Sequence, residues 1–376
     1  MAIPDHILLM YDFFRNALFK LDPERAHQVT AAAARAAQLT RVDRLLEDKF
    51  VYDDMRLRQS VWGMYFANPV GLAAGFDKNA ALVPFWSTLG FGFAEVGSVS
   101  ARPSRGNPRP RAYRLPEDEA LVNRMGLNNK GAVRVSSRLS RFASRRTIPI
   151  GINLAKTHDP NIAGEAAVED FRESFELLAP QADYVALNIS CPNTRDGKTF
   201  EEPDALETLL RAVMQQRRES APRVPVLLKL APSLTDRVVF DSEIEAIVEL
   251  GLKYGISGFI ASNTTPDREG LITDRERVAA AGAGGLSGRP LEARATHLVR
   301  YLYRRTGGSV PIIGVGGVFS AEDAYRKIRS GATLVQIYTA LVYRGPGLVR
   351  DLKVGLVKLL ERDGFSSIAG AVGADA

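Results

Sequence analysis

Eight short apolar runs alternate with helix-like stretches from residue 69 onward, and this rhythm constrains the fold more than any other feature of the sequence. The runs span residues 69–75, 93–100, 149–155, 184–190, 226–231, 258–264, 311–317 and 334–340. Continuous apolar runs are typical of parallel strands that are covered on both faces. Eight of them with intervening helices predict an α/β fold, namely a (β/α)8 or TIM barrel. A doubly wound open sheet is the alternative, although no G-x-G-x-x-G motif follows the first run.

Residues 1–48 precede this rhythm and predict an N-terminal extension of two helices. The apolar side chains of the first helix fall on one stripe, formed by Ile7, Tyr11, Phe14 and Leu18. Asp22 and Pro23 then provide an N-cap and a first-turn proline for the second helix. We therefore divide the chain into a helical extension over 1–48 and a barrel domain over 49–376. The extension is a helical arm packed on the barrel, an amphipathic element that meets a membrane surface or an apolar ligand, or both.

The composition excludes several classes of protein. One cysteine among 376 residues cannot form an internal disulfide, which favours a reducing compartment. The N-terminus carries Asp5 where a signal peptide would be basic, and Asp12 and Arg15 interrupt its apolar stretch well before the ~18 residues of a membrane span. The net charge of +6 allows contact with phosphates, anionic lipid or nucleic acid. Tyr113 alone interleaves the arginine-rich segment 102–114, so we interpret this segment as a solvated basic loop and expect no nucleic-acid partner.

Polar side chains and glycines gather where the predicted strands end, which is where barrels of this type carry their chemistry. They are Lys78, Ser98, Asn153, Asn188, Lys229, Asn263, Thr264, Gly316, Gly317, Tyr338 and Thr339. Asn123 joins them from a hairpin predicted over residues 111–125, and another hairpin is predicted over 57–69. Several converging amides suit a flat heterocycle with alternating N–H and C=O groups, such as a pyrimidine or a flavin.

The same positions exclude three common kinds of site. The four histidines are scattered, and no two of them have metal-ligand spacing on one element, so we expect no metal. The strand ends lack the paired carboxylates of a glycosidase. No histidine lies near a strand end to complete a Ser-His-Asp triad.

Two glycine clusters and a lysine stand out within this set. Residues 314–317 follow the seventh strand, where backbone N–H groups commonly cradle a phosphate. The cluster at 284–290 predicts a tight turn or a mobile lid. Lys229 is embedded in an apolar strand and needs a partner, which is either an electron-rich cofactor or an acid in the barrel interior.

The single cysteine, Cys191, lies in the segment LNISCPNT (residues 187–194) directly after the fourth strand. A free cysteine is often a small buried hydrophobe. Here hydroxyls and amides surround it, and Pro192 prevents the strand from continuing. A thiol with an ordinary pKa of ~8.5 acts as a general base near neutral pH once it is modestly activated. We therefore favour a catalytic role for Cys191.

Nine ordered motifs resemble those of the dihydroorotate dehydrogenase family. They are GLAAGFDKN, NRMGLNNKG, GINLAKT, LNISCPNT, LLKLAP, ASNTTPDR, GGLSGRPL, PIIGVGGVFS and GATLVQIYTALVYRGP, and the resemblance covers the chain from about Asp22 to its end. The helical extension resembles that of the membrane-associated, quinone-using class 2. The resemblance implies an FMN-containing flavoprotein that oxidises dihydroorotate to orotate in de novo pyrimidine biosynthesis and passes electrons to a membrane quinone. It also implies peripheral attachment to the cytoplasmic face of the cell membrane through the N-terminal helices.

The resemblance also assigns roles to individual residues. The FMN-binding set is Ala74, Gly75, Ser98, Asn153, Asn188, Lys229, Ser262, Gly288, Gly317, Tyr338 and Thr339. The substrate-binding set is Lys78, Asn123, Arg124, Met125, Gly126, Leu127, Asn188, Asn193, Asn263 and Thr264. Lys78 would pair with the substrate carboxylate, and Lys229 would stabilise negative charge on the reduced flavin. Cys191 would remove the C5 proton while hydride passes from C6 to the flavin.

Two segments depart from the class that the extension resembles. The quinone class usually carries serine at the base position, in SSPN, whereas this chain has SCPN, as in the soluble class. The following NTRDGKTFEEP also differs from the NTPGLR of the quinone class. A soluble-type enzyme with another acceptor, an FMN barrel acting on dihydrouracil or dihydrouridine, and a phosphate-binding barrel without catalysis are therefore the alternatives. We favour the quinone class, because a whole two-helix element weighs more than one substitution.

Overall fold

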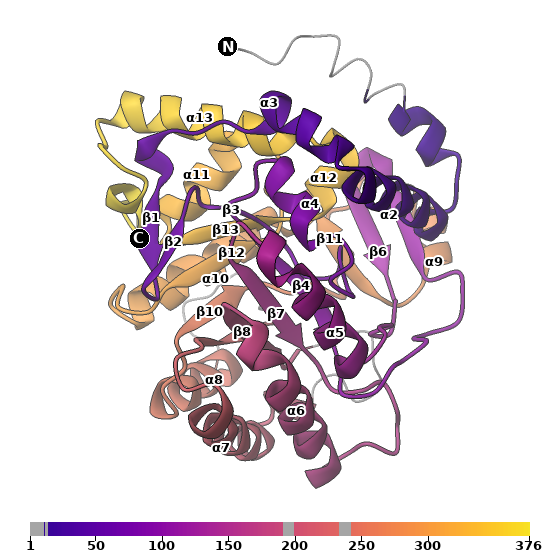
Figure 1. Ribbon diagram of the computed structural model, residues 1–376, viewed down its shortest axis with the longest axis vertical. Coiled ribbons are helices and arrows are strands. Elements are labelled where there is room, and N and C mark those ends of the chain that lie inside the picture. Colours follow the sequence, from indigo (N-terminus) through magenta and orange to yellow (C-terminus); the bar gives the residue numbers. More distant parts are fainter. Residues whose placement is uncertain (1–10, 12–13, 191–198, 233–241) are drawn as a thin grey trace.

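The computed structural model describes residues 11, 14–190, 199–232 and 242–376, and its centre is a closed barrel of eight parallel strands (Figure 1). In chain order these are β3 (Val70–Leu72), β4 (Phe93–Val99), β7 (Ile150–Leu154), β8 (Tyr184–Asn188), β9 (Val226–Leu230), β10 (Gly258–Ala261), β12 (Ile312–Val315) and β13 (Leu334–Ile337). Each lies within one of the predicted runs, so the (β/α)8 barrel is confirmed and the open sheet is wrong. The last strand closes the ring on the first, with Gln336 beside Gly71.

Large side chains fill the barrel interior at the end where the strands begin. Phe66 packs edge-on against Phe93, with 5.6 Å between the ring centroids, and Trp62 lies 6.4 Å from Phe66. Trp62 and Phe66 belong to the hairpin predicted before the first strand, which is confirmed as β1 (Gln59–Val61) and β2 (Met64–Phe66). This hairpin closes one end of the barrel and leaves the carboxyl ends of the strands for ligands.

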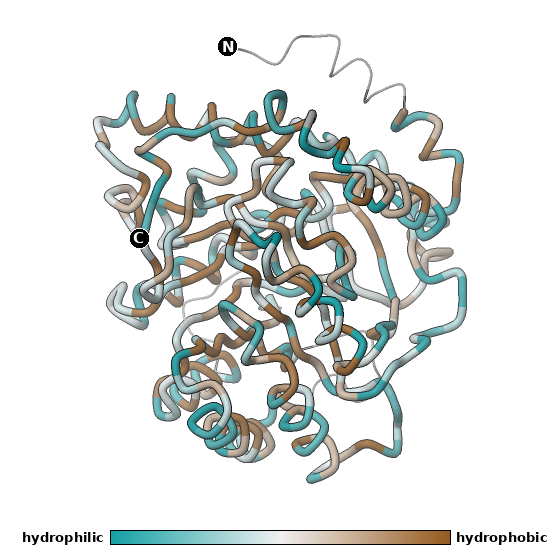
Figure 2. The backbone as a smooth tube through the Cα atoms, viewed as in Figure 1, coloured by the Kyte–Doolittle hydropathy of each residue, from teal (hydrophilic) through white to brown (hydrophobic). Residues whose placement is uncertain are grey.

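Helices surround the barrel. They are α4 (Val83–Thr88), α5 (Ala132–Phe142), α6 (Glu165–Leu178), α7 (Pro203–Ser220), α8 (Ser242–Lys253), α9 (Arg275–Ala281), α10 (Glu292–Arg305), α11 (Ala321–Arg329), α12 (Thr339–Arg344) and α13 (Leu348–Asp363). Apolar side chains such as Phe171 and Phe175 of α6 are fully buried beneath them. Figure 2 shows hydrophobic residues concentrated in the central strands and hydrophilic stretches along the outer sides of the helices. Short 3-10 turns lie at Val42–Leu46, Met55–Leu57, Pro116–Asp118, Ala143–Arg145, Ala179–Gln181, Thr199–Glu201, Arg289–Leu291 and Ala369–Ala371.

A smaller antiparallel sheet stands beside the barrel, formed by β5 (Ala112–Leu115), β6 (Ala120–Asn123) and β11 (Gly285–Gly288). The first two strands confirm the hairpin predicted over 111–125. The third corrects the prediction of a tight turn or a lid over the glycine cluster at 284–290, because Gly285–Gly288 form a strand and a 3-10 turn begins only at Arg289. Glycine allows this pairing because a Cβ at Gly288 would lie 2.3 Å from the backbone oxygen of Glu119.

The second helix of the predicted extension is α2 (Pro23–Thr40), and it is followed by α3 (Glu47–Phe50). The carboxylate of Asp22 caps α2 by accepting hydrogen bonds from the backbone N–H groups of Glu24 at 3.0 Å and Arg25 at 3.1 Å. The predicted cap and first-turn proline are therefore confirmed. In the folded structure, α2 contacts α4 and β5 (Figure 1).

The first predicted helix is described only in part. Tyr11 and residues 14–19 are helical, and Ile7 of the predicted stripe lies outside the described residues. The hydroxyl of Tyr11 donates a hydrogen bond to the backbone oxygen of Val342 at 2.7 Å. Within the described chain, no helix has both the length and the apolar character that crossing a bilayer requires.

Candidate active site

A cavity of about 1040 Å³ lies at the carboxyl ends of the barrel strands. Its lining comes from the residues that follow β3, β10, β12 and β13 and from the smaller sheet. The same cavity reaches α2, which contributes Ala26, His27, Ala31 and Ala34. One space therefore joins the polar strand ends to the helical extension.

Most residues that the resemblance assigns to a ligand line this cavity. From the cofactor set these are Ala74, Gly75, Ser98, Asn188, Lys229, Ser262, Gly288, Gly317, Tyr338 and Thr339. From the substrate set they are Lys78, Asn123, Met125, Leu127, Asn188, Asn263 and Thr264. Asn153, Arg124 and Gly126 are not among the lining residues. Cys191 and Asn193 lie outside the described residues.

The three remaining residues are held by contacts with other parts of the chain. Asn153 is fully buried and contacts the cavity-lining Ser98. The guanidinium of Arg124 stacks on the ring of Tyr113 at 4.9 Å and donates a hydrogen bond to its hydroxyl at 2.6 Å. Gly126 packs so tightly that a Cβ would lie 2.6 Å from the backbone nitrogen of Asn107. Of the three, Asn153 is the one that contacts a cavity-lining residue of the predicted set.

A chain of hydrogen bonds joins the predicted amides. Ser98 Oγ donates to Asn153 Oδ1 at 2.5 Å, and Asn188 Nδ2 donates to Ser98 Oγ at 3.2 Å. Asn263 Nδ2 donates to Asn188 Oδ1 at 3.1 Å and to the backbone oxygen of Ser190 at 2.6 Å. Side chains from β4, β7, β8 and the segment after β10 thus meet at one end of the barrel, as their strand-end positions predict.

Lys229 has an acid partner inside the barrel. Its Nζ lies 3.7 Å from Glu95 Oε1, and both side chains are buried. Glu95 also accepts hydrogen bonds from Asn153 Nδ2 at 2.9 Å, Tyr184 OH at 3.0 Å and Gln336 Nε2 at 2.9 Å. Because Lys229 lines the cavity as well, its ammonium faces both an interior acid and the ligand space.

The donors and acceptors of the cavity fit a cofactor with a flat N–H-bearing ring and a phosphate. Gly316 and Gly317 follow β12 with positive φ values of 116° and 70° and expose backbone to the cavity. A Cβ at Gly317 would lie 2.7 Å from the backbone nitrogen of Glu292, so a larger residue does not fit. Gln336 also lines the cavity, and among the described residues its buried Oε1 has no hydrogen-bond partner. A ligand N–H group would satisfy that oxygen.

A tight turn after β3 positions Lys78. The carboxylate of Asp77 accepts hydrogen bonds from the backbone N–H groups of Ala81 and Leu82, both at 2.8 Å, and burial raises the pKa of Asp77. The neighbouring Lys78 lines the cavity, and its Nζ donates to Asn128 Oδ1 at 2.7 Å. An ammonium at this place offers a charge-assisted partner to an anionic group of a ligand.

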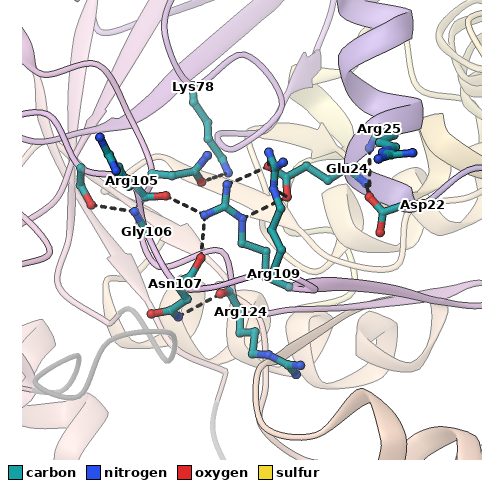
Figure 3. A network of polar contacts seen from close by, with 12 residues as sticks. Asp22, Glu24, Arg25, Lys78, Arg105, Gly106, Asn107, Arg109 and Arg124 are labelled. Carbon is teal, nitrogen blue, oxygen red and sulfur yellow. Dashed lines mark hydrogen bonds and ion pairs between the residues drawn. The ribbon is translucent and has the colours of Figure 1, made fainter.

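An ionic cluster fastens α2 beside the cavity. Glu24 accepts two hydrogen bonds from Arg109, at 2.8 and 3.0 Å, and two from Arg111, at 2.7 and 3.1 Å. Burial raises the pKa of Glu24, but the hydrogen bonds from Arg111 and Arg109 prevail and lower it to about 2. Figure 3 shows Glu24 reaching from α2 to Arg109 and the loop that carries it. The prediction of a solvated loop over 102–114 is therefore wrong at Arg111, which is buried because it pairs with Glu24.

His27 lies one turn further along α2 and lines the same cavity. Burial and the positive charge of Lys78 lower its pKa to about 4, against smaller opposing effects of Glu24 and of a hydrogen bond with the backbone of Phe76. Its ring packs edge-on against Phe76, with 5.0 Å between the centroids. The imidazole is therefore neutral at physiological pH.

Four further residues shape the site and were not predicted from the sequence: Glu95, Gln336, Asn128 and Glu24. The first two were visible in principle, because a polar side chain in an apolar strand needs a partner and this signal had already singled out Lys229. Asn128 and Glu24 carry no comparable local signal, since their partners depend on how the segment after β6 and the helix α2 fold back onto the barrel.

A closed barrel with a cavity that carries amides and lysines at the carboxyl ends of its strands defines the protein as a (β/α)8-barrel enzyme. Residues 56–360 match the family model described as "Dihydroorotate dehydrogenase". The chain therefore belongs to the dihydroorotate dehydrogenase family, and its full-length relatives are of the quinone class.

Two curated relatives and one solved structure illustrate this similarity. The "Dihydroorotate dehydrogenase (quinone)" of Roseiflexus castenholzii is 47% identical over 369 residues, which cover 98% of this chain and 97% of that protein. The protein of the same name from Deinococcus deserti is 48% identical over 369 residues, covering 96% and 98%. A crystal structure of dihydroorotate dehydrogenase from Eimeria tenella in complex with ferulenol has a TM-score of 0.81 at 34% identity, and covers 94% of this chain and 96% of its own. The quinone class, favoured over the soluble type in the sequence analysis, is thereby confirmed.

Proposed function

We propose that this quinone-class dihydroorotate dehydrogenase binds FMN and dihydroorotate at the strand ends and meets its quinone beside α2. The observation that carries the proposal is the single cavity that joins the amide-lined strand ends to the apolar inner face of α2. Two substrates that never react directly need two access routes to one cofactor, and a continuous cavity supplies them. FMN held at the strand ends would supply the acceptor for the hydride from C6 of dihydroorotate and the donor of two electrons to the quinone.

The residues at the strand ends suit an anionic pyrimidine. Lys78 is the ammonium that would pair with the carboxylate of dihydroorotate. Asn123, Asn188 and Asn263 line the same space and offer uncharged donors and acceptors for the ring N–H and C=O groups. Binding of this kind orients C5 and C6 of the ring and excludes water from them.

Cys191 is the proposed base that takes the proton from C5. It follows Asn188, the last residue of β8, by three positions in the sequence. Among the cavity-lining residues that the structure describes, the carboxylates are Glu24 and Asp77, and both are engaged elsewhere, with arginines and with backbone N–H groups. His27 is a weak base, because its pKa is lowered to about 4. A thiolate matched to neutral pH is the better proton acceptor.

The quinone end of the cavity belongs to the extension, which we place over residues 1–48 against a barrel domain over 49–376. Ala31 and Ala34 give α2 a smooth inner wall, while Val29, Leu39 and Val42 are exposed apolar side chains on its outer side and in the turn that follows. A helix with apolar side chains on both faces suits a peripheral position at a bilayer, where the quinone is dissolved. We therefore propose attachment to the cytoplasmic face of the membrane.

Anaerobic addition of dihydroorotate to the purified protein tests this function. We expect a visible flavin band that dihydroorotate bleaches and that a soluble quinone restores. Dihydrouracil, which lacks the carboxylate, is the matched control and should bleach the band at least about tenfold more slowly, because it cannot pair with Lys78. If dihydroorotate does not bleach the flavin, the proposed substrate is wrong. If the purified protein is colourless, the proposed cofactor is wrong.

A further inference from the structure

Glu95 is a fully buried carboxylate in the middle of the apolar strand β4. Its two oxygens are approached by donors from four other strands: Asn153 of β7, Tyr184 of β8, Lys229 of β9 and Gln336 of β13. A buried carboxylate is costly unless it is paired and hydrogen-bonded, and here each neighbour supplies an N–H or O–H group. Because Glu95 has four donors and no access to solvent, we expect a function of this carboxylate in the site.

The hydrogen bonds that begin at Glu95 run in one direction. Asn153 turns its Nδ2 toward Glu95, which leaves its Oδ1 to accept from Ser98. Ser98 Oγ then accepts from Asn188 Nδ2, and Asn188 Oδ1 accepts from Asn263 Nδ2. A carboxylate can only accept, whereas an amide can be turned end for end. The acid at the head of this chain therefore decides which end of each amide faces the next residue.

The same carboxylate fixes the lysine of the site. Glu95 Oε1 lies 3.7 Å from Lys229 Nζ and is also the oxygen that accepts from Asn153. The two charges offset one another within the barrel, so the ligand space faces a paired ammonium rather than an isolated one. Because burial and the charge of Glu95 raise the pKa of Tyr184 well above its usual value, the phenol stays a hydrogen-bond donor and does not neutralise the acid.

We propose that Glu95 is a positioning residue for the reaction, which orients the amide chain from Asn153 to Asn263 and balances the charge of Lys229. The proposal rests on the proposed function, since it concerns the FMN and pyrimidine sites described above. It predicts two separable effects. Loss of the acceptor weakens pyrimidine binding, because the amides lose their fixed direction. Loss of the charge leaves Lys229 uncompensated, which favours the more negative, reduced flavin.

The test compares Glu95→Gln with wild-type protein, both loaded with FMN. Orotate is titrated into the oxidised protein through the flavin spectrum, and the midpoint potential of the flavin is measured against redox dyes. We expect orotate to bind about tenfold or more weakly, as a lost set of oriented hydrogen bonds implies. We expect the potential to rise, where about 30 mV corresponds to a tenfold change for a two-electron couple. Tyr184→Phe, which removes a neutral donor and keeps the acid, should retain orotate affinity within about threefold.

Ser98→Ala separates the two effects and covers the case in which Glu95→Gln does not fold. It interrupts the chain between Asn153 and Asn188 but leaves the charges of Glu95 and Lys229 in place, so orotate affinity should fall while the potential rises less than in Glu95→Gln. The proposal is overturned if Glu95→Gln leaves orotate affinity and flavin potential unchanged, or if Ser98→Ala binds orotate with full affinity. In either case, bleaching of the wild-type flavin by dihydroorotate would still support the proposed function. A wild-type flavoprotein that binds no orotate overturns both.

Discussion

The polar residues of the barrel interior divide the work between charge and orientation. Lys78 and Lys229 line the ligand cavity as cations, and the amides of Asn188 and Asn263 supply neutral donors and acceptors between them. The proton of C5 needs a base, and we propose that Cys191, in the segment after β8, takes this role. The thiol is therefore the residue whose substitution separates chemistry from binding.

Cys191→Ala should lower the rate of flavin bleaching by dihydroorotate at least about a hundredfold, since general base catalysis commonly contributes that much. Cys191→Ser is the matched variant, because serine keeps the size but has a far higher pKa than a thiol. We expect it to retain part of the rate and to shift the pH optimum upward, and the wild-type optimum to lie below that of serine-based relatives. Stopped-flow bleaching across pH measures both. Near-normal bleaching by Cys191→Ala would remove Cys191 from the mechanism.

At this scale, the sequence identified the site residues better than their partners. The amides and both lysines were predicted from their positions at strand ends, and the cavity collects nearly all of them. The partners that orient them were harder to predict, because Glu95 and Gln336 lie within strands rather than at their ends. The contact between Lys78 and Asn128 depends on the path of the chain beyond β6, which no local pattern specifies.

The helix α2 is held against the barrel domain by the buried ion pair between Glu24 and Arg111. Its cap was predictable from Asp22 and Pro23 alone, since capping is a local property. Its docking was not predictable, because Glu24 reaches Arg111, which lies 87 residues away in the sequence. The arginine-rich segment 102–114, which we interpret as a solvated loop from the sequence alone, therefore holds the extension in place through Arg109 and Arg111.

Glu24→Gln should loosen α2 and reduce the free energy of unfolding by about 3 kcal/mol, because it leaves the buried guanidinium of Arg111 without its counter-charge. The pKa of Glu24 is lowered to about 2 from 4.5, so the pair stabilises the fold fully above pH 4.5 and loses that effect as the pH falls toward 2. The wild-type and variant stabilities should therefore converge across this window. Urea unfolding at several pH values measures the difference.

Glu47→Gln is the control for this experiment, because Glu47 is an exposed acid of the neighbouring α3. It should unfold like the wild type at every pH. A Glu24 variant that matches this control at pH 7 would show that the cluster does not hold α2. Deleting residues 1–48 is a cruder test of the extension, since it also exposes the partner arginine.

Ala31→Leu should narrow the quinone end of the cavity, because Ala31 lies on the cavity wall formed by α2. We expect reoxidation by quinone to slow about tenfold, while bleaching by dihydroorotate stays within about twofold, since the strand ends are untouched. Ala36→Leu adds the same volume at an exposed position of the helix that is not part of the lining. Equal effects of the two variants, measured in separate half-reactions, would argue against quinone entry beside α2.

The net charge of +6 is unevenly distributed over the folded molecule, because several basic side chains cluster beside α2. Three arginines are exposed near one another: Arg35 of α2, and Arg134 and Arg141 of α5. Burial is the main cause that lowers the pKa of Arg138, and the positive charges of these three arginines lower it further. Arg35 and Arg138 also line the cavity. No ion pair with a carboxylate is seen for these arginines within the described part of the chain. The basic surface therefore stands where the proposed membrane contact lies.

Replacing Arg35, Arg134 and Arg141 together by glutamine should weaken binding to vesicles that contain anionic phospholipid by at least about tenfold, because each basic side chain near a bilayer adds to the attraction. Binding of the wild type should fall as salt is raised. The matched control replaces Arg218, Arg223 and Arg304, which are exposed and are not part of the cavity lining. Equal vesicle affinity of the two triple variants, measured by sedimentation, would contradict the proposed orientation.

The architecture was the most predictable level of all. Eight apolar runs with helices between them favour a parallel sheet, and their number favours closure into the barrel that the structure has. The pairing of β11 with β6 escaped prediction because it joins segments that lie far apart in the chain, and because glycine-rich sequence usually indicates a turn. Long-range backbone pairing of this kind leaves no periodic signal.

The barrel strands pair with one another in a closed ring, and α2 takes no part in that pairing. The α2 wall that we propose for the electron acceptor and the strand ends that we propose for the pyrimidine are consequently encoded by separate stretches of the gene. Mutations in one stretch are thereby insulated from the other, so a lineage can retune its choice of oxidant while its pyrimidine chemistry stays under undisturbed selection. A protein engineer can exploit the same modularity by exchanging the leading helices between homologues, provided that the residue equivalent to Glu24 travels with them.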